Sequence, residues 1–379
     1  GDGLFHAYNL LGLKPDAATI DTLYPMLEGQ VAVLSSGAIQ PAEAVEVLEA
    51  LFASTLFRAD QKSFLLYPDR ELPRFLEKNR VPAAQVAGIP LVQSMLARGD
   101  KRIIDRDAAG TYRFNADLAN VGDLDSRLTS LEPTYGDMLE PAREPLRELY
   151  EAVFNHKAFT GRSGGMFGFE GLGCVYWHMV AKLLVAIQEN FFAAREEGVD
   201  EATCKRLGDL YYRVREGMGF NKTPSEFGAY PIDPYSHTPR HAGAQQPGMT
   251  GVVKEEILTR LGELGVRVRD GSVHFEPARL RSREFIATPE PFRYLDVDGQ
   301  WQELMVPAGG LAFTWCQVPV VCRLDESDQP CVSVTRRGGE CQALPELTLP
   351  PEVAREVFQR SGRIRQVELV LTGRQLFSR

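Results

Sequence analysis

The chain has 379 residues, 44% of them hydrophobic and 25% charged, an ordinary balance for a globular protein of one large or two smaller domains. The formal net charge of −9 gives no electrostatic support for binding nucleic acid. The longest apolar run, Leu172 to Ile187, is interrupted by His178 and Lys182 and is too short to span a membrane, so we expect neither nucleic acid nor membrane as a partner.

The first residues of the chain do not have the pattern expected of a targeting signal. It opens with Gly1 and has no initiator methionine, no basic segment and no signal-like apolar core. We therefore expect the sequence to be a piece of a longer protein, whose upstream domains would be partners within the same polypeptide.

Up to residue 265 the sequence is predicted to be mostly helical. Apolar residues recur at helical spacing over residues 17–34, 41–57, 72–77, 82–97, 140–154, 171–194, 200–216 and 251–264. Pro41 suits a first helical turn, and Pro90 is expected to break the helical segment that contains it. Residues 171–194 are apolar almost all round, which predicts a buried helix. Residues 101–115 predict a small hairpin.

From residue 266 the pattern changes to short strands. The turn pairs Asp270-Gly271 and Asp298-Gly299 predict hairpins over 266–275 and 292–306. Further strands are expected within 311–324, 331–335 and 367–371, with a short helix over 351–359. The sequence thus predicts a mainly α protein with a smaller β part. Its helical domain would span residues 1–265 and its antiparallel β domain residues 266–379.

The cysteines give no sign of a metal site or a disulfide framework. None of the six forms a Cys-x-x-Cys pair: Cys174, Cys204, Cys316, Cys322, Cys331 and Cys341. The spacing of the last four matches no zinc ribbon or finger, so we expect neither a metal nor a cofactor. A chain of this size needs no disulfides, which favours buried free thiols in a reducing, cytoplasmic compartment.

Residues 223–250 form the most unusual segment. Its five prolines and three glycines forbid a regular helix or a central strand. Its aromatic residues and low charge distinguish it from a disordered linker, and irregular loops of this length are often functional. We interpret it as an ordered surface that presents polar side chains. A well-packed connector between two domains is the alternative.

The end of this loop and the segment after it resemble a known arrangement. His241-Ala-Gly-Ala-Gln-Gln-Pro-Gly-Met-Thr-Gly251 precedes an apolar helix, and Gly265-Val-Arg-Val and Val273-His-Phe-Glu-Pro277 follow that helix. Over residues 242–277 this order resembles the end of the catalytic domain in inverting disaccharide phosphorylases of the cellobiose and maltose types and in related glycoside hydrolases. Residues 159–189 are also similar to a segment of large bacterial proteins.

The resemblance implies an (α/α)6 toroid-like helical domain followed by a β-sandwich-like domain, with carbohydrate and phosphate as partners. Two features depart from the family. No Gly-Asp-Trp-Asn type segment, which carries the catalytic acid in the cellobiose type, is found, and the helical part is too short for a whole toroid. The toroid would be partial or would begin outside this sequence, unless the likeness is only architectural.

In such toroids the loops that lead into the inner helices line one pocket. The resemblance implies that residues 160–170 and 223–250 are two of these loops. The first loop is rich in glycine, which permits close approach of a ligand to the backbone. Arg162 is suited to hold a phosphate or a carboxylate. Glu170 would lie at the first turn of a helix, where its charged form is favoured. It would then serve as a base or acceptor, or only stabilise the helix.

The second loop holds side chains of the kinds that grip sugar hydroxyls and oxyanions: Asp233, His237, Arg240, His241 and Gln245. Tyr230 and Tyr235 would stack against sugar rings. Pro239 separates the two histidines, which argues against a metal site on a helix face. Alternatively, the polar side chains satisfy the loop's own backbone groups.

Inverting glycoside chemistry needs two acidic groups, or one acid together with bound phosphate. Glu170 with Asp233 or Glu226 is the pair to test, and Glu170 and Asp233 are the predicted catalytic residues. His178 is interpreted as a core histidine or, alternatively, as a catalytic one. The sequence thus predicts a glycoside hydrolase or phosphorylase-like protein whose pocket is formed by the two loops. The alternative is a non-catalytic carbohydrate-binding or scaffolding module of a larger enzyme.

Overall fold

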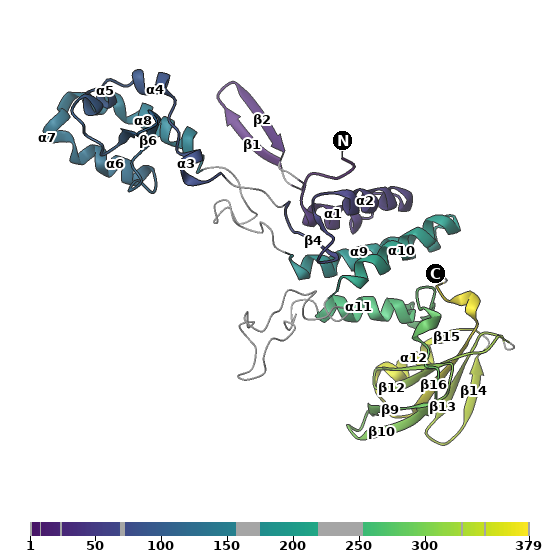
Figure 1. Cartoon of the computed structure of the whole chain (residues 1–379). Coiled ribbons are helices and arrows are strands. Elements are labelled where there is room, and N and C mark those ends of the chain that lie inside the picture. Colours follow the sequence, from purple (N-terminus) through teal and green to yellow (C-terminus); the bar gives the residue numbers. More distant parts are fainter. Residues whose placement is uncertain are drawn as a thin grey trace. The chain divides into compact units, whose positions relative to one another are not determined.

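The computed structural model describes residues 2–7, 9–22, 25–68, 73–156, 175–218, 253–326, 329–344 and 346–377. The chain divides into two compact units (Figure 1). The smaller unit is Asp69–Gly173, and the larger unit combines Gly1–Pro68 with Cys174–Arg379. Helices and strands occur in both. The described strands form sheets of two, three or five strands, none of them a closed barrel.

The smaller unit is a helical module with one small hairpin. Its elements are α3 (Phe75–Lys78), α4 (Ala83–Ala87), α5 (Pro90–Ala97), β5 (Ile104–Arg106), β6 (Tyr112–Phe114), α6 (Val121–Ser130), α7 (Glu132–Tyr135), η1 (Gly136–Met138) and α8 (Leu139–Phe154). The predicted hairpin is confirmed, since Ile104 pairs with Phe114. Pro90 begins α5 and so separates it from α4, as predicted. Leu124, Leu128 and Leu146 lie at the centre of its own hydrophobic core.

The helical part of the larger unit is built around α9 (Trp177–Glu196). This helix packs against α1 (Leu27–Leu34), α2 (Pro41–Ala53), α10 (Glu201–Glu216) and α11 (Val253–Leu264). Val180, Leu183 and Ile187 of α9 are fully buried, so the predicted buried helix is confirmed over its described residues. The short strands β3 (Phe57–Arg58) and β4 (Ser63–Phe64) follow α2.

The predicted helix over residues 17–34 was wrong in its first part. Residues Ala17–Thr22 form strand β2, which pairs antiparallel with β1 (Asn9–Lys14). Thr19, Ile20 and Thr22 are β-branched and favour a strand over a helix. The helix begins only after Pro25, at Leu27.

The β part of the larger unit contains three sheets. A three-stranded sheet has the order β15 (Thr348–Leu349), β8 (Ser272–Phe275), β7 (Val266–Arg269), and a hairpin joins β9 (Glu290–Leu295) to β10 (Trp301–Val306). The five-stranded sheet has the order β11 (Gly310–Trp315), β12 (Val318–Leu324), β16 (Ile364–Leu371), β13 (Cys331–Arg336), β14 (Cys341–Leu344). The remaining elements are η4 (Ser282–Glu284), α12 (Pro351–Phe358) and η5 (Gly373–Gln375).

One pairing corrects the predicted antiparallel β domain. Strands β12 and β16 run parallel, with Val320 opposite Val367. Parallel neighbours need a long crossover connection, and here β13, β14, β15 and α12 lie between the two strands in the chain. The two predicted Asp-Gly hairpins are confirmed.

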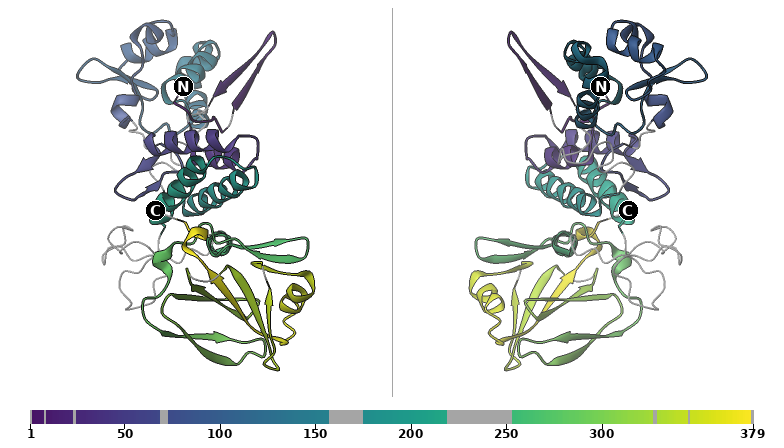
Figure 2. Two further views of the ribbon diagram at one scale, coloured as in Figure 1. Left: turned by 90° about the vertical axis from the view of Figure 1, so that its right-hand side faces the viewer. Right: turned by 90° about the vertical axis from the view of Figure 1, so that its left-hand side faces the viewer.

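Helix α11 joins the helical part to the β part. It packs against α9 and is followed directly by β7, as the views of Figure 2 show. Gly265 ends the helix with a φ of +75°, and a Cβ there would lie 2.3 Å from the backbone of Glu276. Only glycine fits this tight passage into the β part.

Candidate functional site

The site residues predicted from the sequence lie outside the described residues. Arg162 and Glu170 fall within 157–174, and the other seven fall within 219–252: Tyr230, Asp233, Tyr235, His237, Arg240, His241 and Gln245. Their places and roles stay predictions. The described chain resumes after these segments at Val175 and Val253, and the side chains near those two points define a candidate site.

The two helices that follow the predicted loops begin next to each other. His178 lies in the first turn of α9 and Glu255 in the first turn of α11, and His178 Nε2 is 3.2 Å from Glu255 Oε1. Further along, the Gln188 side chain donates a hydrogen bond of 3.1 Å to the carbonyl of Leu258. The starts of α9 and α11 therefore meet, and the helices continue in the same direction.

The His178–Glu255 pair is partly enclosed. The Glu255 side chain is 6% exposed and the His178 side chain 27% exposed. Among the described residues, the second carboxylate oxygen of Glu255 has no hydrogen-bond partner. The Tyr176 hydroxyl lies 3.5 Å from His178 Nδ1. The arrangement offers an imidazole with access to solvent, oriented by a buried carboxylate, which is a common device for binding or proton transfer.

Helix α11 buries its polar face and exposes apolar side chains, the opposite of an ordinary surface helix. Its buried face carries Glu255, Thr259 and Glu263, while Ile257 and Leu258 are more than half exposed, at 55% and 53%. An amphipathic surface helix normally buries its apolar stripe. The buried face of α11 is therefore fixed by polar partners rather than by apolar packing.

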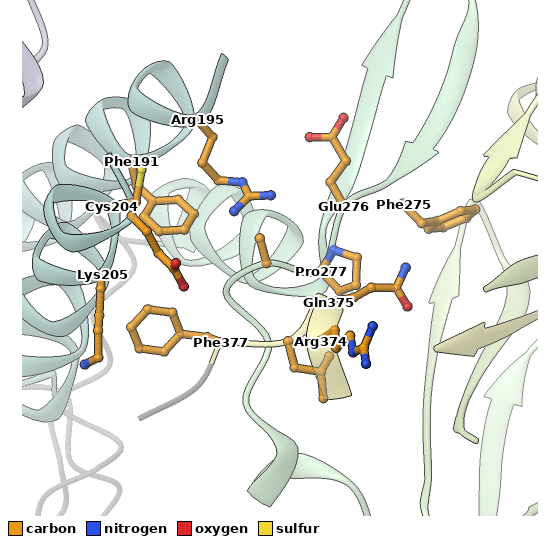
Figure 3. A pocket seen from close by; sticks show the side chains of 13 residues that line it. Phe191, Arg195, Cys204, Lys205, Phe275, Glu276, Pro277, Arg374, Gln375 and Phe377 are labelled. Atoms are coloured by element: carbon orange, nitrogen blue, oxygen red, sulfur yellow. The ribbon is translucent and has the colours of Figure 1, made fainter. Parts of the chain in front are cut away.

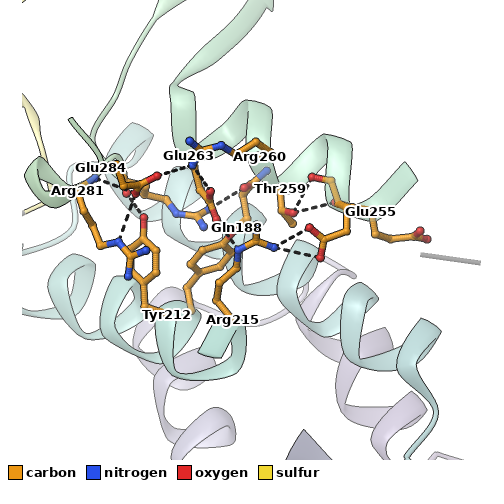
Figure 4. Close-up of polar contacts among 12 residues, drawn as sticks. Gln188, Tyr212, Arg215, Glu255, Thr259, Arg260, Glu263, Arg281 and Glu284 are labelled. Atoms are coloured by element: carbon orange, nitrogen blue, oxygen red, sulfur yellow. Dashed lines mark hydrogen bonds and ion pairs between the residues drawn. The ribbon is translucent and has the colours of Figure 1, made fainter. Parts of the chain in front are cut away.

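Glu263 is the centre of these polar contacts (Figure 4). The Tyr211 hydroxyl donates to it at 2.6 Å, Arg215 Nε lies 3.0 Å away and Arg260 Nη1 2.7 Å away. Burial raises the pKa of Tyr211, so its hydroxyl stays protonated and donates. Arg215 also binds Glu256 at 2.8 Å, and these contacts tie α10 to α11.

A second buried guanidinium ties the β part to the helices. Arg279 is fully buried, and its Nη1 donates to Gln188 Oε1 at 2.7 Å. Its guanidinium carbon lies 3.3 Å from the ring centroid of Tyr211, a cation–π contact. Its Nε and Nη2 have no hydrogen-bond partner among the described residues. The α10–α11 contacts and Arg279 together form a charged, largely buried junction.

A cavity of about 400 Å³ lies between α9, α10 and the chain on either side of Pro277 and Leu376 (Figure 3). Phe191 and Phe377 give its lining apolar surface, and charged side chains of both signs complete it: Arg195, Lys205 and Arg374 with Glu201 and Glu276. Burial raises the pKa of the Cys204 thiol in its wall, which keeps the thiol protonated and a poor nucleophile. The described lining thus offers a binding surface but no activated nucleophile.

The described residues offer neither a metal site nor a membrane-spanning helix. No group of three or more His, Cys, Asp or Glu side chains in them could hold a metal ion. None of their helices combines the length and apolar character needed to cross a membrane.

Residues 72–157 match the family model of the GH149 phosphorylase insertion domain 2. No curated protein gives a significant match to the chain. The matched residues fall within the smaller unit, which the chain inserts between the two parts of the larger unit. The match supports a relationship of this chain to glycoside phosphorylases, which are carbohydrate-active proteins.

Sequence reasoning considered His178 but missed Glu255. The signal was present: Glu255, Thr259 and Glu263 lie on one face of a predicted helix whose other face carries isoleucine and leucine. The usual assumption that apolar residues face inward would give the wrong side for α11. Its polar face is buried because His178, Tyr211 and Arg215 on neighbouring helices supply partners.

Proposed function

We propose that this chain forms part of a glycoside phosphorylase, with a pocket made by residues 160–170 and 223–250. The observation that carries the proposal is the match of residues 72–157 to a phosphorylase insertion domain. The resemblance of residues 242–277 to inverting disaccharide phosphorylases supports it independently, because those residues belong to the larger unit. A toroid-like arrangement of the helices and a relationship to the cellobiose and maltose types are part of the proposal.

The contact between His178 and Glu255 supports a shared pocket. The chain resumes from the first loop at Val175 and from the second at Val253, only a few residues before these two side chains. The two loops thus rejoin the described chain at neighbouring points. Two helix N-termini also meet there, and their dipoles favour a bound anion such as phosphate.

The chemistry would be phosphorolysis with inversion. Phosphate attacks the anomeric carbon from one face of the sugar while an acid protonates the departing glycosidic oxygen on the other. Glu170 or Asp233 would be the acid. The phosphate would be held by cationic or imidazole groups, Arg162, Arg240, His237 and His241, while Gln245 binds hydroxyls. Tyr230 and Tyr235 would stack on sugar rings.

The test is whether the protein turns over β- and α-linked gluco-oligosaccharides only when phosphate is present. The release of sugar 1-phosphate measures this turnover. Glu170→Gln and Asp233→Asn should each be compared with the parent chain, with thermal unfolding as the control for folding. One of them should lose at least 100-fold in rate without a change in stability, since a general acid contributes on the order of 10²–10⁴-fold. Undiminished turnover in both variants would remove these two assignments.

A second variant pair tests the shared pocket. Glu255→Gln keeps the shape of the side chain but weakens its hold on His178, so it should raise the KM for phosphate more than it lowers kcat. Ser35→Ala is a matched control, because it removes the hydrogen bond of Ser35 to Glu189 on the same helix, α9, far from its start. If both variants change the KM for phosphate equally, the proposed role of the α9 and α11 N-termini in binding phosphate is contradicted.

A non-catalytic carbohydrate-binding or scaffolding role is the second candidate. It is favoured by the nature of the match, which is to an insertion domain rather than to a catalytic one. Thermal shift separates the two proposals. Stabilisation that requires sugar and inorganic phosphate together supports the phosphorylase site, and stabilisation by sugar alone supports a binding module.

A further inference from the structure

The end of α11 opposite Glu255 borders a cavity of about 590 Å³ with a strongly ionic lining. The lining comes from the turn between β3 and β4, the end of α10, α11 and η4. It consists of five cationic side chains and three acidic ones: Lys62, Arg215, Arg260, Arg281 and Arg283, with Glu216, Glu263 and Glu284. The cations are in excess, although the chain as a whole carries a net charge of −9.

Two of the guanidinium groups are held in place. Glu284 receives Arg260 Nη1 at 2.6 Å and Arg281 Nε at 3.3 Å, and the Arg281 guanidinium carbon lies 3.9 Å from the ring centroid of Tyr212 (Figure 4). Burial raises the pKa of Glu284, but the charges and hydrogen bonds of Arg260 and Arg281 outweigh it and hold the pKa below its usual value. Glu284 therefore stays ionised and fixes both arginines at neutral pH.

The fixed arginines keep unused donors. Arg260 uses only Nη1 in its bonds to Glu263 and Glu284, and Arg281 uses only Nε and its backbone N–H. Within the part of the chain that the structure describes, Arg283 makes no hydrogen bond or ion pair. Glu263 and Glu284 are already engaged by these arginines. The cavity thus offers several free N–H donors and few free acceptors.

This excess of free donors over free acceptors determines which kind of ligand the cavity can bind. A neutral sugar presents both donors and acceptors, whereas an oxyanion presents acceptors only. Planar guanidinium groups bind phosphate oxygens in pairs, and charge-assisted bonds of this kind are stronger than neutral ones. We infer that the cavity binds a phosphate-type oxyanion, either free phosphate or the phosphate group of a phosphomonoester.

This cavity lies apart from the His178–Glu255 pair. Glu255 and Glu263 are eight residues apart on α11, which places them about 12 Å apart along the helix. The inference goes beyond the proposed function. It does not depend on turnover, because it rests only on the arginines around Glu284.

The test is calorimetric titration of the full chain with inorganic phosphate and with glucose 1-phosphate, at constant ionic strength set with sodium chloride. Arg283→Ala removes the exposed arginine that the structure leaves unbound, so the protein should fold normally. We expect this variant to weaken phosphate binding at least tenfold, as expected for the loss of one charge-assisted hydrogen bond. Arg374→Ala, in the cavity of Figure 3, is the matched control and should bind as the parent does.

The two ligands distinguish the sources of phosphate. Tighter binding of glucose 1-phosphate than of phosphate, lost in Arg283→Ala, identifies a phosphomonoester site. Weaker binding of glucose 1-phosphate than of phosphate identifies a site for free phosphate, and equal binding of both shows that the site recognises the phosphate group without the sugar. Unchanged binding of both ligands in Arg283→Ala, or no binding to the parent chain, would overturn the inference.

A further variant separates this site from the proposed pocket. His241→Ala should abolish phosphate binding by the loops and leave the Arg283-dependent binding intact. If the proposed function fails, the parent chain still binds one phosphate, and Arg283→Ala alone weakens that binding at least tenfold. If the second site fails, His241→Ala alone removes all binding.

Discussion

The two units of the chain differ in how deeply their ion pairs are buried. In the smaller unit the ion pairs lie at the surface: Asp125, with a side chain 28% exposed, binds Arg143 and Arg147, which are 25% and 37% exposed. In the larger unit the Glu263 side chain is 3% exposed and that of Arg215 is 10% exposed. Both units have apolar cores, but among the described residues only the larger unit also buries charges, where its helices meet its β part.

This difference in burial indicates which unit is expected to bind ligands. Burying an ion pair costs desolvation free energy that its attraction often does not recover, so such pairs are poor stabilisers compared with apolar contacts. They persist where a charge is needed or where a single arrangement must be specified. The smaller unit, which matches an insertion domain, shows no such buried charge among its described residues.

Glu263→Gln should have the largest effect on stability, and this effect should fall on the larger unit. It leaves Arg215 and Arg260 buried or half-buried without their shared carboxylate, and we expect a loss of about 3–5 kcal/mol in the free energy of unfolding of the larger unit. Urea unfolding followed by tryptophan fluorescence measures it, because the three tryptophans, Trp177, Trp301 and Trp315, all belong to this unit.

The matched control is Asp125→Asn in the smaller unit. It also removes a carboxylate that binds two arginines, but this one is exposed to solvent. A change of less than about 1 kcal/mol is expected in the unfolding free energy of the smaller unit, as for other surface ion pairs. Circular dichroism follows this unfolding, because all three tryptophans belong to the larger unit. Similar losses in both variants would show that burial does not distinguish the two units.

Leu128→Ala should have the second largest effect and should act on the smaller unit alone. Leu128 is fully buried in the core formed by α5, α6 and α8. Removing its side chain should destabilise the unit by about 2–5 kcal/mol through lost transfer free energy and the cavity left behind. Hydrogen exchange read by mass spectrometry localises the effect, and faster exchange in α9–α11 would contradict the independence of the units.

The parts of the fold that the sequence predicts well are those with local signals. Asp270-Gly271 predicts its hairpin because both residues adopt positive φ, 48° and 78°. Pro90 likewise marks the start of α5. The hairpin over residues 9–22 is less visible, because its alternation is mixed with residues that also fit a helix.

The candidate site is less predictable because its partners are distant in the sequence. Glu263 and Tyr211 are 52 residues apart, and His178 and Glu255 are 77 apart. No local sequence pattern predicts that a glutamate on one helix will contact a histidine on another. The loops at 160–170 and 223–250 were recognised from composition and resemblance, and their residues stay predictions.

The last substitution is at Asp100 in the smaller unit, where the expected effect on stability depends on pH. Hydrogen bonds from the Arg102 side chain are the main cause that lowers the pKa of Asp100 to about 2, and the Tyr135 hydroxyl also donates to it at 3.0 Å. The folded pKa thus lies below the ordinary value of 3.8. The ionised carboxylate therefore stabilises the folded smaller unit above about pH 4, and this contribution is lost as pH falls toward 2.

Because Arg102 is partly exposed, we expect this contribution to be about 1–2 kcal/mol at neutral pH. Asp100→Asn removes it at every pH. The difference in unfolding free energy between the parent chain and this variant should be full at pH 7, shrink between pH 4 and pH 2, and vanish at the acid end. All other groups titrate alike in both proteins, so the difference isolates Asp100. A difference that stays constant down to pH 2 would show that the variant acts through packing and not through charge.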